Sequence, residues 1–178
     1  RAQHNLFVGP DRQWVADTYV PAHVRRYPFA LAETPTPDNF LICLDEGCAG
    51  LNDTEGQALF LDDGAEGPLL AEVRTFLLNL HQAFQRSTAW CNEVAELGLL
   101  TPRTLSWTDH QGAAQELSGF LAIDEERLRA LPAEVTQRWM NTGLMAVAWA
   151  HLLSLGHART LAARQKLADT AAPAPAAQ

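Results

Sequence analysis

The sequence predicts an α+β protein, and a change of hydrophobic period along the chain carries this prediction. Up to about residue 67, short apolar runs alternate with Gly, Pro and Asp turn residues, a pattern typical of an antiparallel β region. From Pro68 to Leu97, apolar residues recur at three- and four-residue steps, which predicts one long amphipathic helix ended by Gly98. We therefore expect an N-terminal antiparallel β region packed on a long central helix, followed by a β-hairpin and a C-terminal helical cluster.

The first third of the chain contains the predicted strands. Asn5–Val8 and Gln13–Ala16 flank the turn residues Gly9-Pro10-Asp11 and predict a β-hairpin. Phe40–Leu44 is a continuous apolar run, which favours a strand buried on both faces. Ala58–Leu61 predicts a further short strand. These runs are consistent with a meander whose pairing the sequence leaves open.

The central helix and the elements after it follow from periodicity and capping residues. Leu77, Leu80 and Phe84 lie on the predicted inner face of the helix, so we expect all three to be buried. Asp124 is placed to cap a short helix whose first turn is acidic. The other predicted elements are a hairpin of Arg103–Thr108 with Gln115–Ile123 and helices over Pro132–Thr142, Leu144–Leu155 and His157–Leu167.

Composition limits the class of protein. The hydrophobic content of 47% and charged content of 19% are those of an ordinary globular protein. They predict a single domain over residues 1–168, followed by a disordered Ala/Pro tail over residues 169–178. The net charge of −8 argues against a nucleic-acid partner. No apolar run approaches the roughly 20 residues that a membrane span needs.

The cysteines and histidines predict neither a metal site nor a bound cofactor. Three cysteines are an odd number, and they form no C-x-x-C motif, which fits a reducing compartment such as the cytoplasm. We expect Cys43 and Cys91 to be inert core residues and Cys48, in a Gly-rich turn, to be the reactive one. No histidine pair has the i, i+4 spacing of a helical metal site.

The segment Trp14–Ala32 is the strongest candidate for a functional centre. One helical turn over Pro21–Arg26 and a strand over Tyr27–Ala32 are expected there. Arg25 and Arg26 fall in the last turn of that helix, where positive charge is favourable. Because successive helical residues are about 100° apart, one of them can point inward while the other meets water.

These arginines could form a pocket for an anion or a peptide carboxylate, since a guanidinium binds carboxylates bidentately and aromatic rings supply flat walls. The candidate residues are Trp14, Asp17, Tyr19, Arg25, Arg26 and Tyr27. The alternative is structural: one arginine pairs with Asp17, Asp45 or Glu46.

His151 is a separate candidate, on an apolar helix beside Ser154. A hydrogen-bonded core histidine competes with a catalytic base as its interpretation.

A family resemblance runs through most of the chain. Tyr19–Ala32 reads Y-V-P-A-H-V-R-R-Y-P-F-A-L-A, which resembles the central signature of the bacterial SapC family, named for an association with surface-layer genes. The resemblance continues through Leu41–Glu46, Glu55–Leu70, Glu96–Pro102, Gly119–Pro132 and Ala150–Gly156. Two departures are an apparent insertion at Thr18 and a histidine, His23, at a position that is usually apolar or aromatic. The resemblance also implies a natural N-terminal segment before Arg1, which we expect to add strands to the β region.

The expected function depends mainly on the family resemblance, because individual residues indicate little about it. SapC-like genes typically lie near genes for TonB-dependent receptors, tryptophan-halogenase-like proteins and cupin-like hydroxylases. With no familiar catalytic motif in the sequence, we expect a non-catalytic binding or adaptor protein, accessory to bacterial uptake or to peptide or surface-protein modification. Its expected partners are halogenase-like, cupin-like or receptor-associated proteins. The alternatives are an enzyme that uses Arg25, Tyr27 and His151 on a small anionic substrate, and a structural subunit without a ligand.

Overall fold

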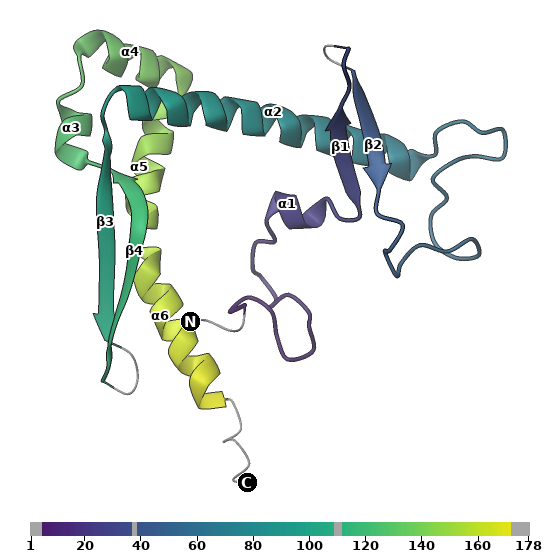
Figure 1. The fold of residues 1–178 in the computed structure, drawn as a ribbon, viewed down its shortest axis with the longest axis horizontal. Helices are drawn as coiled ribbons and strands as arrows, with labels where there is room; N and C mark the ends of the chain where they lie inside the picture. The colour runs from purple at the N-terminus through teal and green to yellow at the C-terminus, as the bar shows by residue number, and fades with distance from the viewer. Residues whose placement is uncertain (1–4, 37–38, 109–111, 172–178) are drawn as a thin grey trace. The chain divides into compact units, whose positions relative to one another are not determined.

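A computed structural model describes residues 5–36, 39–108 and 112–171 of the chain. Its architecture is α+β, as predicted: two small antiparallel sheets, a long central helix and C-terminal helices (Figure 1). The chain divides into two compact units, which we call unit 1 (Arg1–Val15 with Trp90–Gln178) and unit 2 (Ala16–Ala89). The single domain predicted over residues 1–168 stays a prediction.

Unit 2 contains α1 (Ala22–Arg25), β1 (Phe29–Glu33), β2 (Phe40–Leu44) and most of α2 (Pro68–Glu96). Pro21 precedes the single turn of α1, and the Tyr27–Pro28 peptide bond that leads into β1 is cis. β1 and β2 pair antiparallel, from Phe29 opposite Leu44 to Glu33 opposite Phe40. The helix and strand predicted in the Trp14–Ala32 segment are confirmed, with boundaries displaced by one or two residues.

The two faces of the β1–β2 sheet differ. On one face the ring of Phe40 contacts His81 of α2, with 4.8 Å between ring centroids, so this face packs on the helix (Figure 1). The opposite face includes Leu41 and Cys43, and both are exposed. The prediction that Phe40–Leu44 is buried on both faces was wrong, because the strand alternates between a helix-covered face and an exposed one.

The predicted long helix is confirmed as α2. It ends as expected at Gly98, which has a positive φ of 65°, and the Leu99 N–H donates back to the Val94 carbonyl over 3.1 Å. Leu77 is buried and Leu80 half-buried, but Phe84 is 51% exposed, so its predicted burial was wrong. The physical reason is length: 29 residues extend about 44 Å, whereas only two strands, about 5 Å apart, cross the helix (Figure 1).

Unit 1 holds the last turns of α2 and all later elements. These are β3 (Leu100–Thr108), β4 (Ala114–Ile123), α3 (Glu125–Arg129), α4 (Ala133–Thr142), α5 (Leu144–Ser154) and α6 (His157–Ala171). The predicted hairpin is confirmed as β3–β4, with a register shift opposite Arg103–Leu105 and a positive φ of 82° at Gly119. The helix α6 includes the first three residues of the predicted C-terminal tail, 169–171, and residues 172–178 lie outside the described residues.

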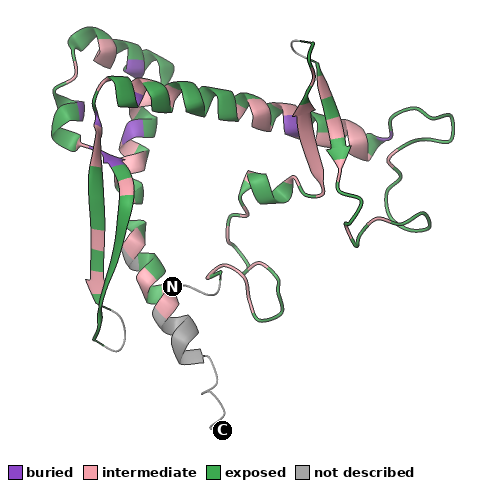
Figure 2. Ribbon diagram, viewed as in Figure 1, coloured by how far each residue is buried: buried purple, intermediate pink, exposed green. Residues whose placement is uncertain are grey.

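A buried cluster in unit 1 joins the end of α2 to β4 and the C-terminal helices (Figure 2). Asp124 caps α3 as predicted, because its carboxylate accepts hydrogen bonds from the N–H groups of Glu126 and Arg127. The buried members of the cluster are Val94, Leu99, Ile123, Leu128, Trp139 and Ala148. This cluster is the main hydrophobic core of unit 1.

Two predicted β elements are reduced to single bridges. The N-terminal hairpin of Asn5–Val8 with Gln13–Ala16 is represented by one bridge between Val8 and Trp14, and the strand Ala58–Leu61 by one between Phe60 and Glu66. An isolated pair of short strands is only marginally stable without a third strand or a packed helix. Among the described residues, no helix combines the length and apolarity of a membrane span.

Candidate functional site

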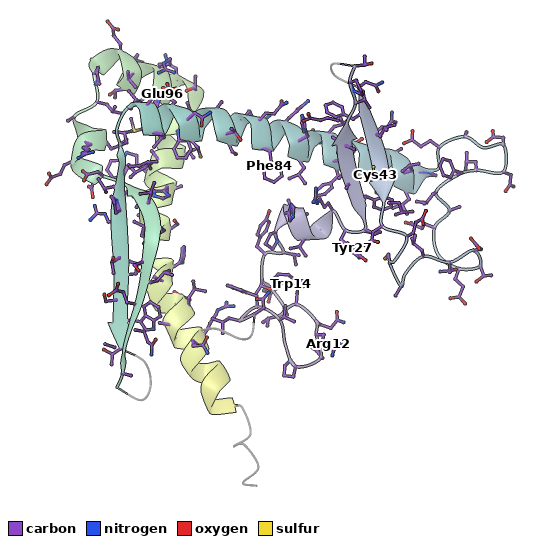
Figure 3. The ribbon with its side chains drawn as sticks, in the orientation of Figure 1. Arg12, Trp14, Tyr27, Cys43, Phe84 and Glu96 are labelled. Atoms are coloured by element: carbon purple, nitrogen blue, oxygen red, sulfur yellow. The ribbon has the colours of Figure 1, made fainter. Side chains whose placement is uncertain are left out.

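An open pocket of about 580 Å³ lies in unit 2, between α1 and the paired ends of β1 and β2. Tyr27 and Cys43, which both line it, are labelled in Figure 3. Its lining combines three side chains that can carry charge, His23, Arg26 and Asp45, with mostly apolar residues. The lining residues are His23, Val24, Arg26, Tyr27, Pro28, Phe29, Ala30, Cys43, Leu44 and Asp45.

The two adjacent arginines occupy different environments, as the helical geometry predicts. The guanidinium carbon of Arg25 lies 5.6 Å from the ring centroid of Tyr19 and 5.4 Å from that of Phe76 on α2. Both distances are within the range of cation–π attraction. Arg26 instead lines the pocket. Arg25 therefore connects α1 to the long helix, while Arg26 is one of the residues that line the pocket.

The ion pair considered for these arginines does not form. Asp17, Asp45 and Glu46 are all described residues, and neither arginine makes a salt bridge with any of them. The structural alternative, an ion pair with one of these carboxylates, was therefore wrong. Two aromatic rings, rather than a carboxylate, contact Arg25.

Tyr27 and Asp45 form the polar part of the pocket wall. Desolvation of the Tyr27 hydroxyl, followed by the negative charge of Asp45 and the proximity of Cys48, raises the pKa of Tyr27 above its usual value. The phenol therefore stays neutral near pH 7 and acts as a hydrogen-bond donor. A turn orients Asp45: its carboxylate accepts the Gly47 N–H over 3.0 Å, and its own N–H donates to the Pro28 carbonyl over 2.9 Å.

The cysteine environments reverse the sequence-based expectation. Cys43 and Cys91 are free and exposed, whereas Cys48 is half-buried beside Tyr27. The predicted burial of Cys43 failed because its strand position points away from α2, and that of Cys91 because its side of α2 is uncovered. Within the described part of the chain, no three His, Cys, Asp or Glu side chains form a group that could hold a metal ion.

The structure brings only some of the candidate residues together. Arg26 and Tyr27 line the pocket, whereas Tyr19 and Arg25 contact each other and do not line it. Asp17 is an exposed residue of unit 2 with a positive φ of 59°, and it does not line the pocket. Trp14 belongs to unit 1, where it pairs with Val8.

His151 also belongs to unit 1, and its hydrogen bonds are those of a structural residue. Its Nε2 accepts the Ile123 N–H over 3.2 Å, which ties α5 to the end of β4. The Ser154 hydroxyl donates to the His151 carbonyl over 2.7 Å, so the expected partnership with Ser154 runs through the backbone. These contacts favour the interpretation of His151 as a hydrogen-bonded structural histidine rather than a catalytic base.

Sequence reasoning missed an interaction network in unit 1. The Glu93 carboxylate accepts hydrogen bonds from the Arg138 guanidinium and, over 2.8 Å, from the Trp139 indole N–H. These hydrogen bonds, that of Arg138 foremost, hold the pKa of Glu93 below its usual value. Partners separated by 45 residues leave no local signal in a sequence. Asp45 is also a pocket residue that was absent from the predicted site; the hydrogen bond from its N–H to the Pro28 carbonyl, far back in the sequence, brings it there.

The fold and the pocket define an α+β protein with an open, ligand-sized depression beside a short helix. A family model described as SapC matches residues 1–161, and the chain belongs to the SapC family. No curated protein and no solved structure gives a significant match to the chain.

Proposed function

We propose that this SapC protein is a non-catalytic binding protein and that the pocket beside α1 is its ligand site. The observation that carries the proposal is the composition of the pocket lining: Arg26, Tyr27 and Asp45 occur there together with apolar residues. Pockets that recognise small ligands combine an apolar lining with a few polar groups that fix orientation.

The state of the polar groups favours recognition over acid–base catalysis. With its pKa raised, the Tyr27 phenol is a donor near pH 7 and a poor base. The alternative enzyme would use Arg25, Tyr27 and His151, but of these three only Tyr27 lines the pocket. The Arg25 guanidinium lies near two aromatic rings, and the Nε2 of His151 accepts the Ile123 N–H.

The proposal extends to the biological system through family membership. We propose that the protein is an adaptor, accessory to bacterial uptake or to the modification of a peptide or surface protein. Its proposed partners are halogenase-like, cupin-like or receptor-associated proteins. Three free cysteines support the proposal that it works in the reducing cytoplasm.

Co-purification with neighbouring halogenase-like and cupin-like gene products tests this proposal. Three forms of the protein serve as bait: wild type, Arg26→Ala and the control Arg86→Ala. Arg86 is an exposed arginine of α2 in the same unit, outside the pocket. Arg26→Ala should capture less partner at an unchanged melting temperature, while Arg86→Ala should capture as much as wild type. Equal capture by all three forms would contradict the pocket as the binding site.

A further inference from the structure

We infer that the pocket beside α1 binds a zwitterion, with the ligand's carboxylate on Arg26, its ammonium group on Asp45, and its apolar part against the uncharged residues of the pocket. The inference rests on the proposed function and specifies its ligand. Two sources share this chemistry, a free amino acid and a short peptide.

The first argument is the arrangement of charge. Arg26 and Asp45 line the same pocket, yet they form no salt bridge with each other or with another of the described residues. Opposite charges that stand apart at one opening are both available to a ligand. A ligand that supplies one charge of each sign compensates both of them, whereas a simple anion or cation compensates one.

The second argument concerns Asp45, which is oriented but not saturated. Its carboxylate accepts the Gly47 N–H over 3.0 Å and lies against the Tyr27 hydroxyl. A carboxylate offers about four acceptor positions. Two of these contacts hold it in place, so acceptor capacity remains for an ammonium group. Tyr27 thus acts as a positioning residue for Asp45.

The third argument comes from net charge and from the pocket floor. The chain carries a net charge of −8, so its long-range field opposes the approach of anions but is neutral toward a zwitterion. Ala30 and Cys43, opposite each other on β1 and β2, contribute small uncharged side chains to the pocket lining. A volume of about 580 Å³ is within the usual range of ligand pockets. It accommodates an amino acid with a large side chain or a short peptide.

Isothermal titration calorimetry with four probes tests the inference. L-phenylalanine and L-alanyl-L-phenylalanine carry both charges, phenylpropionate lacks the ammonium group, and phenethylamine lacks the carboxylate. At least one zwitterion should bind at least about tenfold more tightly than either singly charged probe, since each charge-assisted hydrogen bond contributes that much. Preference between the amino acid and the dipeptide identifies the source. Equal binding of phenylpropionate, or no binding of either zwitterion, would overturn the inference.

Matched variants locate the binding. Arg26→Gln should lower zwitterion affinity to that of phenethylamine, and Asp45→Asn should lower it to that of phenylpropionate. The amide oxygen that Asp45→Asn introduces can still accept the Gly47 N–H, so the turn is preserved. The control Arg86→Gln should leave affinity unchanged. Loss of affinity in Arg86→Gln, or none in Arg26→Gln, would overturn the assignment. If the zwitterions fail while partner capture still depends on Arg26, the inference is wrong and the proposed function stands.

Discussion

The guanidinium carbon of Arg25 lies 5.4 Å from the ring centroid of Phe76, which fastens the short helix α1 to the long helix α2. The ring centroid of Tyr19 lies 5.6 Å from the same guanidinium carbon. The next residue, Arg26, makes neither of these contacts and lines the pocket instead. The two consecutive arginines thus occupy different environments, Arg25 against aromatic rings and Arg26 in the pocket lining.

This division predicts different stabilities for the two alanine variants. Arg25→Ala should lower the free energy of unfolding by about 0.5–1 kcal/mol, the strength of an exposed cation–π contact. Arg26→Ala should be nearly neutral. Urea denaturation of both variants measures the difference. A larger loss for Arg26→Ala would show that the roles of the two arginines are reversed.

The two hydrophobic residues Leu77 and Phe84 of α2 should also respond differently to truncation. Leu77 is only 2% exposed, so Leu77→Ala should cost about 2–5 kcal/mol of unfolding free energy. Phe84 is 51% exposed, and Phe84→Ala should cost much less. Denaturation midpoints provide the comparison. Similar costs for both would mean that Phe84 is buried in solution, as its helical position alone predicts.

Glu93 should make a pH-dependent contribution to stability. Its hydrogen bonds with Arg138 and Trp139 lower the pKa of its carboxyl in the folded state. A lowered pKa stabilises the fold above the unfolded-state pKa of about 4.3 and loses that contribution as the pH falls through the folded value. The stability difference between wild type and Glu93→Gln should therefore be constant above about pH 5 and shrink in more acidic solution. A difference that stays the same at all pH values would be inconsistent with this network.

Glu93→Ala provides a second readout at neutral pH. Trp139 is fully buried, and this variant leaves its indole N–H without the Glu93 acceptor. An unsatisfied buried donor costs about 1–3 kcal/mol. Glu93→Gln keeps an oxygen acceptor, so it should be the more stable of the two variants in thermal melts. The opposite order would mean that the Trp139 hydrogen bond contributes little.

Local signals in the sequence predict much of the fold. The apolar run Phe40–Leu44 coincides with β2, the start of the three- and four-residue period at Pro68 coincides with the start of α2, and Asp124 caps α3 as expected. In each case the signal and the structure involve neighbouring residues, so pattern and propensity are sufficient.

The environment of each side chain was harder to predict. A continuous apolar strand does not reveal how many of its faces are covered, and Cys43 is exposed because a helix packs on only one of them. The helical angle between Arg25 and Arg26 predicts that their side chains point in different directions. Only the tertiary structure shows that the Arg25 guanidinium contacts the ring of Phe76. Contacts between residues distant in sequence, such as that of Glu93 with Arg138, leave no periodic trace.

The pocket contains a thiol, that of Cys43, whose rate of modification can report whether a ligand occupies the pocket. Cys43 is exposed and lines the pocket, whereas Cys91 is exposed and belongs to unit 1. Alkylation by iodoacetamide, followed residue by residue with mass spectrometry, therefore compares a site thiol with an internal control in the same molecule. Without ligand, both should react readily, because both are accessible.

The most direct test of the ligand site is the alkylation rate of Cys43 in the presence of L-phenylalanine, L-alanyl-L-phenylalanine, phenylpropionate or phenethylamine. At least one probe should slow the modification of Cys43 in a concentration-dependent manner, the zwitterions most strongly, while the rate at Cys91 stays constant. If no probe protects Cys43, or if Cys91 is protected to the same degree, the pocket beside α1 is not the binding site for this class of ligand.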